Sequence, residues 1–331
     1  MPRRSRLHLG NPIADAITNL EFAPRSDNLL VSSWDSSLRL YDVKGSVLRV
    51  EAPSEAALLD CCFSGDDVAF SVGSDGCVRR YDLNSGAQDV VGRHEDMATH
   101  VESSGLSCQV VTAGFDRNVR LWDTRMDHKA LCSKDVNAIV ESMSLAGFDL
   151  LVATGSLVNQ YDIRSLEGPV WGKEVMTGNI IRCISSSLDL KGFVAGSVDG
   201  HVAVEIFPSP YSHPNGYIFK CRPKVKNGKH HLVSVNSIAF NPLRVGSFVT
   251  GDDQGYISVW DALTKNTLLE LPRLPNSVAS LAFNHNSRLL AVASSFTYQE
   301  ANELEEHPEI FIYEMDQNDH VSFSGGRSAK K

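Results

Sequence analysis

One ten-residue pattern returns along the chain at nearly constant spacing. It occupies residues 33–42, 73–82 and 114–123, and the aspartates that close the copies are 40 and 41 residues apart. Each copy contains a small residue, an aspartate seven positions before its end, an alternating apolar stretch and a final aromatic–Asp pair. The pattern is typical of two strands joined by a tight turn, and its period is that of four-stranded propeller blades.

Weaker copies of the pattern raise the count to seven blades. Segments near residues 150–162 and 193–206 lack part of the pattern, whereas those near 248–261 and 289–313 keep most of it. The sequence therefore predicts an all-β fold, a seven-bladed WD40 β-propeller that forms a single domain over residues 1–316. The polar, Ser/Gly-rich residues 317–331 are predicted to be a disordered C-terminal tail.

Several local features of this propeller can also be predicted. The alternating stretch Leu7–Leu9 is expected to be a lone N-terminal strand that completes the last blade and hides an open sheet edge, with a frayed terminus as the alternative. Leu29–Ser32 has the composition of an inner strand, and Leu38–Tyr41 alternates like a half-buried outer strand. The repeated turn aspartate is expected to accept main-chain N–H groups, which is a structural role.

Composition and motifs exclude several function classes. The net charge of −9 and pI near 5.6 argue against general binding to a nucleic acid backbone, and no apolar stretch is long enough to span a bilayer. The seven cysteines lack metal-ligand spacing, so reduced core cysteines of an intracellular protein are expected. There is no nucleotide-binding glycine loop or nucleophile elbow, and His230–His231 fits a solvated loop better than a metal site. We expect a monomeric, non-enzymatic binding module without cofactor or metal.

Four residues stand out as candidates for a binding site, and three of them are expected on one rim of the ring. Trp34 and Phe115 each precede a turn aspartate, and an exposed aromatic pair on a propeller face would anchor a peptide; packing of each ring on a neighbouring loop is the alternative. Arg182 opens the inner strand of the fifth blade, where a partner carboxylate would explain it; an internal salt bridge is the alternative. Lys220, on an alternating stretch within the excursion that follows the inner strands of the fifth blade, is a weaker candidate, and a solvated surface lysine is favoured over it.

The acidic insertion at residues 300–309 interrupts the seventh blade. A solvated loop is favoured, and a mobile flap or a docking surface for a basic partner is the alternative.

Several stretches resemble one particular group of WD-repeat proteins. The chain is similar to the budding-uninhibited-by-benzimidazole (Bub) family of mitotic checkpoint propellers, specifically its third member, as a divergent paralogue. The segments that carry the resemblance span nearly the whole chain and include its insertions: residues 31–35, 39–42, 182–184, 200–205, 219–221, 280–283 and 306–312.

The resemblance implies a spindle assembly checkpoint adaptor, found in the nucleus and cytoplasm and at the kinetochore in mitosis. Its implied partners are an extended acidic motif of checkpoint kinases or kinase-like proteins, phosphorylated Met-Glu-Leu-Thr repeats of a kinetochore scaffold, and the anaphase-promoting-complex activator complex. Arg182 matches the family's glutamate-binding arginine, Trp34 its top-face tryptophan, and Lys220 a lysine near the phosphate. Two positions depart from the family: Phe115 replaces a second tryptophan, and His201 replaces an arginine. Because His is largely neutral at pH 7, we expect weakened reading of phosphopeptides.

Two other functions remain open from the sequence. Propellers of messenger RNA export form a sister family that binds a nucleoporin segment by similar top-face contacts. Many WD propellers are ubiquitin-ligase substrate receptors, and an arginine two places after the aromatic–Asp close, as at Arg125 and Arg164, is a sequence cue for that role.

Overall fold

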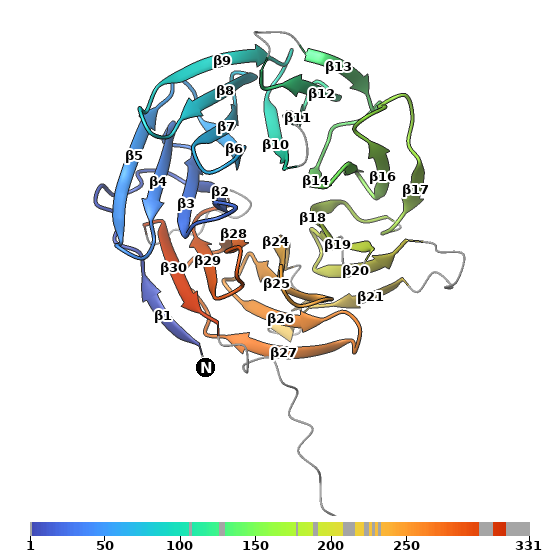
Figure 1. Cartoon of the computed structure of the whole chain (residues 1–331). Coiled ribbons are helices and arrows are strands. Elements are labelled where there is room, and N and C mark those ends of the chain that lie inside the picture. The colour runs from blue at the N-terminus through green and yellow to red at the C-terminus, as the bar shows by residue number, and fades with distance from the viewer. Residues whose placement is uncertain are drawn as a thin grey trace, which may run out of the picture.

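The computed structural model shows a closed ring of seven four-stranded antiparallel sheets, arranged like the blades of a propeller around a central axis (Figure 1). It describes residues 2–105, 108–125, 130–176, 178–187, 191–207, 216–221, 225–226, 229–230, 233–297 and 307–315. The predicted fold class is confirmed. The predicted tail at 317–331, most of the acidic insertion and the side chains of His230–His231 lie outside the described residues.

The strands of each blade follow one another from the axis outward. Blades one to four are β2 Ile17–Phe22, β3 Asn28–Ser33, β4 Ser37–Asp42 and β5 Val47–Pro53; β6 Leu58–Phe63, β7 Val68–Gly73, β8 Cys77–Asp82 and β9 Gln88–Arg93; β10 Ala98–Ser104, β11 Gln109–Gly114, β12 Asn118–Asp123 and β13 Ala130–Asp135; β14 Ser142–Ala146, β15 Asp149–Thr154, β16 Leu157–Asp162 and β17 Trp171–Glu174. Blades five to seven are β18 Ile181–Ser187, β19 Gly192–Ser197, β20 His201–Ile206 and β21 Tyr217–Lys220; β24 Val235–Phe240, β25 Ser247–Asp252, β26 Ile257–Asp261 and β27 Asn266–Leu271; β28 Val278–Phe283, β29 Leu289–Ser294, β30 Glu309–Glu314 and β1 Arg3–Arg6. A separate short hairpin pairs β22 Val225–Lys226 with β23 Lys229–His230.

Burial depends on a strand's place in its blade. The second strand of each blade is almost wholly buried, because neighbouring blades cover both of its faces. The prediction that Leu38–Tyr41 is a half-buried outer strand was wrong: β4 is the third of four strands and largely buried, since β5 pairs along its outer edge. Leu29–Ser32, predicted as an inner strand, belongs to the second strand of its blade, and β2 lies between that strand and the axis.

The N-terminal segment closes the ring, as predicted, but the strand lies earlier in the chain than Leu7–Leu9. β1 pairs antiparallel with β30, with Arg3 opposite Glu314 and Arg6 opposite Phe311. Leu7 follows the strand, donates its N–H to the carbonyl oxygen of Ile310 at 2.9 Å, and is buried between the first and last blades. The alternation of Leu7–Leu9 reflects this packing, whereas four exposed polar residues form the strand itself.

The apolar core consists of separate clusters between neighbouring blades. One joins the first and seventh blades, and others join each later pair, so no blade has a core of its own. The small residue of the repeat follows from this close packing. A Cβ atom on Gly114 would lie 2.1 Å from the carbonyl oxygen of Met97, the residue that directly precedes the innermost strand of the same blade.

The seven cysteines are all free thiols, but they are not all core residues as predicted. Cys61, Cys62, Cys77 and Cys183 are buried, whereas Cys108 and Cys132 are exposed on the third blade.

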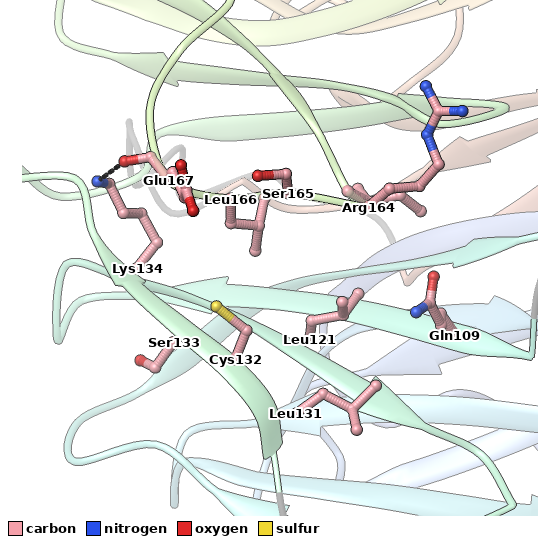
Figure 2. Close-up of a pocket in the computed structure, with 11 residues that line it drawn as sticks. Gln109, Leu121, Leu131, Cys132, Ser133, Lys134, Arg164, Ser165, Leu166 and Glu167 are labelled. Carbon is pink, nitrogen blue, oxygen red and sulfur yellow. Dashed lines mark hydrogen bonds between the residues drawn. The ribbon is translucent and has the colours of Figure 1, made fainter.

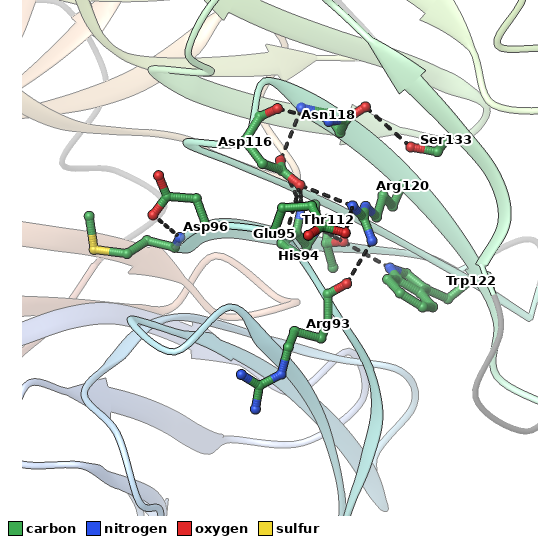
Figure 3. A network of polar contacts seen from close by, with 11 residues as sticks. Arg93, His94, Glu95, Asp96, Thr112, Asp116, Asn118, Arg120, Trp122 and Ser133 are labelled. Carbon is green, nitrogen blue, oxygen red and sulfur yellow. Dashed lines mark hydrogen bonds and ion pairs between the residues drawn. The ribbon is translucent and has the colours of Figure 1, made fainter.

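A buried hydrogen-bond network connects the turn aspartate of the third repeat with its closing aromatic residue (Figure 3). His94 contacts the Asp116 carboxylate through Nδ1 at 3.0 Å and Thr112 Oγ1 through Nε2 at 2.7 Å. Trp122 donates its indole N–H to the same Thr112 oxygen at 2.8 Å. Burial lowers the pKa of His94, so the neutral ring donates from Nδ1 to Asp116 and accepts the Thr112 hydroxyl at Nε2. The repeated aspartate and aromatic residue thus hold two strands and the incoming loop together.

We expect Thr112→Val to lower the free energy of unfolding by about 2–4 kcal/mol, because it leaves two buried polar groups without their partner. Urea unfolding followed by tryptophan fluorescence measures the change. Thr267→Val, on the exposed face of β27, is the matched control and should unfold like the unaltered protein. A Thr112→Val protein as stable as this control would contradict the structural role of the network.

Candidate functional site: the mouth of the axial cavity

The order of the strands defines two ends of the ring. Because the strands of each blade are antiparallel, the second strand ends and the third begins at one end of the ring, whereas the first strand ends and the second begins at the opposite end. Trp34 follows β3 and Phe115 follows β11, so both lie at the first end, called here the top. Their N–H groups donate to the carbonyl oxygens of Ala16 and Met97 at 2.8 and 2.9 Å, the equivalent bond in each blade.

An ion pair fixes the turn that carries each aromatic residue. Arg39 donates two hydrogen bonds to the Asp35 carboxylate, at 3.0 and 2.8 Å, and both side chains are buried. Burial opposes ionisation of Asp35, but the bonds from Arg39 and Ser33 outweigh it and lower the pKa of this carboxyl. Arg120 holds Asp116 in the same way at 3.1 Å. The aspartates are therefore structural, as predicted, and each places a neighbouring aromatic side chain at the top.

Trp34, Phe115 and Arg182 line one cavity on the propeller axis, with a volume of about 650 Å³. The two rings come from blades one and three and are each 40% exposed. Arg182, the second residue of β18, is also exposed, and among the described residues no carboxylate oxygen lies within 4.0 Å of its guanidinium. The alternative of an internal salt bridge for Arg182 is therefore not supported.

The charge of Arg182 nevertheless affects the pKa values of two neighbouring groups, Glu141 and His100. Burial raises the pKa of Glu141, and the charge of Arg182 partly offsets that rise. Burial and, to a smaller extent, the charge of Arg182 lower the pKa of His100 to about 4. The cavity thus presents one unpaired cation beside two aromatic rings.

Three carboxyl groups lie deeper along the axis, on the innermost strands of blades one to three. Burial raises the pKa of Glu21 to about 8 and that of Asp60 to about 7, and it raises the pKa of Glu102 well above its ordinary value. The three charges would also repel one another. Burial therefore disfavours the charged form of all three carboxyls, whereas the Arg182 guanidinium at the mouth carries a permanent charge.

Polar side chains on the innermost strands also join each blade to the next. The Asp60 carboxylate accepts the Asn19 amide at 2.6 Å and the Val101 N–H at 2.9 Å, which links three blades. Serine hydroxyls accept main-chain N–H groups across other boundaries, in the pairs Ser280–Leu20, Ser142–Ile184 and Ser237–Leu281. The walls of the cavity are consequently rigid.

His201 and Lys220 lie apart from the axial cavity. They face each other on the third and fourth strands of blade five, near the top but toward its outer edge. The His201 ring contacts the Asp199 carboxylate through Nδ1 at 2.7 Å. The five predicted site residues therefore divide into a central set of three and an outer pair.

A second cavity of about 580 Å³ lies on the outer side, between blades three and four (Figure 2). Leu131 and Leu121 of blade three line it, and Lys134 donates to the main-chain oxygen of Glu167 at one end. It contains none of the five predicted site residues. Arg164, at its other end, is paired with Asp162.

Neither a membrane-spanning helix nor a metal-binding cluster is found in the described part of the chain. No helix there is long and apolar enough to cross a membrane. No group of three or more His, Cys, Asp or Glu side chains there has an arrangement that could hold a metal ion.

Comparisons with known proteins agree with this architecture. The family described as "WD domain, G-beta repeat" matches residues 7–42 and 90–123. "Mitotic checkpoint protein BUB3.3" of Arabidopsis thaliana is 45% identical over 310 residues, which cover 94% of this chain and 99% of that protein. The chain belongs to the Bub3 family of mitotic checkpoint proteins. The resemblance inferred from the sequence is therefore confirmed.

Two further matches are more distant from this Bub3 family member. "mRNA export factor GLE2" of Chaetomium thermophilum is 27% identical over 309 residues, covering 89% of this chain and 85% of that protein. The solved "Structure of U3-55K" superimposes with a TM-score of 0.82 at 16% identity, covering 95% of this chain and all of that one, and supports the fold alone.

The sequence did not predict the carboxyls on the innermost strands, or the arginines that pair with the turn aspartates. The signal for the arginines was present, because an arginine follows the turn aspartate by four positions in each of the first three repeats. The signal for Glu21, Asp60 and Glu102 was a carboxyl within the first strand, which each of the first three blades contains. In the sixth blade two aspartates are adjacent in the sequence. Asp252 is the one that accepts the turn N–H groups, and the Asp253 N–H donates to the carbonyl oxygen of Ser234.

We expect Glu21→Gln to raise the melting temperature at about pH 8, by roughly 5 °C, and to change it little at about pH 5. A carboxyl whose pKa rises on folding from 4.5 to about 8 favours the folded state when protonated. Its contribution is complete below the unfolded pKa and is lost as the pH rises toward the folded one, whereas glutamine has no proton to lose.

Thermal unfolding of both proteins across this range gives the difference. The opposing pH dependence of His100, whose pKa is lowered, is common to both proteins and cancels. A difference that does not grow with pH would show that Glu21 is ionised in the folded state.

Proposed function

We propose that this protein is a non-enzymatic adaptor of the spindle assembly checkpoint that binds an extended acidic peptide across its top. The observation that carries the proposal is the convergence of Trp34, Phe115 and the unpaired Arg182 at the mouth of the axial cavity. The rings offer apolar anchoring surface, and the guanidinium offers a bidentate site for one carboxylate of the peptide. Membership of the Bub3 family supplies the mitotic role.

The partners that fit this site are the checkpoint kinases or kinase-like proteins and the anaphase-promoting-complex activator complex that the family resemblance implies. Binding to them would recruit the protein from nucleus and cytoplasm to the kinetochore in mitosis. The raised pKa values of Glu21 and Glu102 also favour an acidic ligand, because burial disfavours the charges on these carboxyls that would repel it.

Phosphorylated Met-Glu-Leu-Thr repeats would be read by the outer pair, His201 and Lys220. The pair is weakly suited to phosphate, because the Asp199 carboxylate contacts the His201 ring and would repel a bound phosphate. Weak phosphopeptide reading therefore accompanies the departure of this chain from the family at His201.

Messenger RNA export is the second candidate function. A GLE2 protein matches most of the chain, although at lower identity than the checkpoint relative. The ubiquitin-ligase alternative is less well supported, because both cue arginines form ion pairs within their own turns, Arg125 with Asp123 and Arg164 with Asp162.

We expect Arg182→Glu to abolish recovery of checkpoint and kinetochore proteins in immunoprecipitates from mitotically arrested cells. Reversing a charge that pairs with a buried partner carboxylate costs about 2–5 kcal/mol, a loss of about 30-fold or more in affinity. Arg49→Glu, an exposed arginine on β5 of the same ring, is the matched control and should retain all partners. Recovery of nucleoporins instead would favour the export function. Recovery of a ligase adaptor that is indifferent to Arg182 would favour the receptor function.

We expect His201→Arg to bind a phosphorylated Met-Glu-Leu-Thr peptide about tenfold more tightly than the unaltered protein, because an arginine supplies a permanent charge and two parallel donors. Fluorescence anisotropy with the phosphorylated peptide measures the change, and the unphosphorylated peptide is the control. Equal affinity of the two proteins for the phosphopeptide would refute the role assigned to His201.

A further inference from the structure

The bottom of blade six exposes three large apolar side chains together. Leu243 and Val245 lie in the turn between β24 and β25, and Leu263 lies in the turn between β26 and β27; their side chains are 64, 50 and 58% exposed. These turns join the first to the second strand and the third to the fourth, so they lie at the end of the ring opposite Trp34 and Phe115. We call these three residues the blade-six patch.

Hydrogen bonds from a buried asparagine hold the first turn in place. Asn241 Oδ1 accepts the N–H groups of Leu243 and Arg244, each at 3.0 Å, and the hydroxyl of Ser287 in blade seven at 2.7 Å. The Leu243 N–H also donates to Ser287 Oγ at 3.2 Å. Leu243 is therefore presented to solvent by a turn that is fixed to the neighbouring blade.

The second turn packs directly against the first. The Ala262 N–H donates to the carbonyl oxygen of Gly246 at 2.8 Å. Gly246 has a φ of +73°, and a Cβ atom there would lie 3.1 Å from Cγ of Leu263. The two turns that carry the patch are thus held side by side.

Cations border the patch in a chain whose net charge is −9. Arg244 lies within the first turn, Lys265 follows Leu263 by two residues, and Arg288 directly follows Ser287. Among the described residues none of the three has a carboxylate oxygen within 4.0 Å, and Lys265 lies over the Tyr217 ring at 4.5 Å.

The nearest acid of the two turns is Asp261. Its carboxylate accepts the N–H groups of Leu263 and Thr264 at 2.9 and 3.3 Å, so it is engaged in its own turn.

We propose that the blade-six patch binds a short segment of a partner protein in which apolar residues alternate with aspartate or glutamate. Apolar side chains of the segment would cover the three exposed residues, and its carboxylates would pair with Arg244, Lys265 and Arg288. A second copy of this acidic chain is a poorer fit, because the two copies would repel one another. Since the patch and the axial cavity lie at opposite ends of the ring, both can be occupied at once.

Selection from a phage-displayed library of random peptides on the full chain tests this proposal. The selection uses the Arg182→Glu variant, so that the axial cavity does not contribute, and it is counter-selected on the Leu243→Ser/Leu263→Ser double variant. We expect the enriched peptides to combine at least two apolar residues with at least two acidic ones.

Fluorescence anisotropy with the enriched peptides then measures the site directly. Leu263→Ser and Arg244→Glu should each weaken binding about tenfold or more, and higher salt should weaken it further. Leu131→Ser, an equally apolar and exposed change on β13, is the control and should have no effect. Failure to enrich peptides, enrichment of neutral or basic ones, or indifference to Leu263→Ser would overturn the proposal.

Two measurements distinguish other occupants of the patch. Sedimentation that shows a dimer lost in Leu263→Ser would replace the partner segment with a second copy of the chain. Flotation with phosphatidylserine vesicles that depends on Arg244 would replace it with a membrane surface. Either result would overturn the proposal.

Discussion

The hydrogen bonds that cross from one innermost strand to the next are the interactions on which this ring depends. A single blade has no core, because each apolar cluster is shared by two blades. Neighbouring blades converge at the axis, where side chains such as Asp60 and Ser142 accept the main-chain N–H groups of the adjacent blade. These bonds fix the spacing at which the shared clusters can pack. The propeller is therefore rigid where a cavity needs defined walls.

Burial also shifts the ionisation of groups along the axis. It raises the pKa of Glu21 to about 8 and that of Glu102 well above its ordinary value, which favours the protonated form of both carboxyls. The charge of Arg182 lowers the pKa of Glu141, but among the described residues no carboxylate oxygen lies within 4.0 Å of its guanidinium. An acidic ligand would therefore meet a guanidinium that is free to pair with it.

The sequence predicted the features that repeat and missed those that occur once. The period of the repeated aspartate gave the number of blades, and the residue before it located Trp34 and Phe115, because each repeat places that position at the same end of the ring. The closing strand was predicted too late in the chain, since its residues are exposed and polar and have no apolar alternation. The pairing of His201 with Asp199 also could not be predicted, because it depends on side-chain direction after a turn rather than on spacing alone.

The seventh blade combines three consecutive strands with one that comes from far earlier in the chain, and this affects the order in which the ring can assemble. β1 is synthesised before the first six blades, and β30, with which it pairs, is synthesised after them. During translation β1 must wait while six blades form, since its partner does not yet exist. Closure is thus a contact of very high sequence separation and is expected to be a slow, late step. Until it occurs, the edge of the incomplete seventh blade is open, and the nascent protein is most exposed to strand-to-strand association with its neighbours.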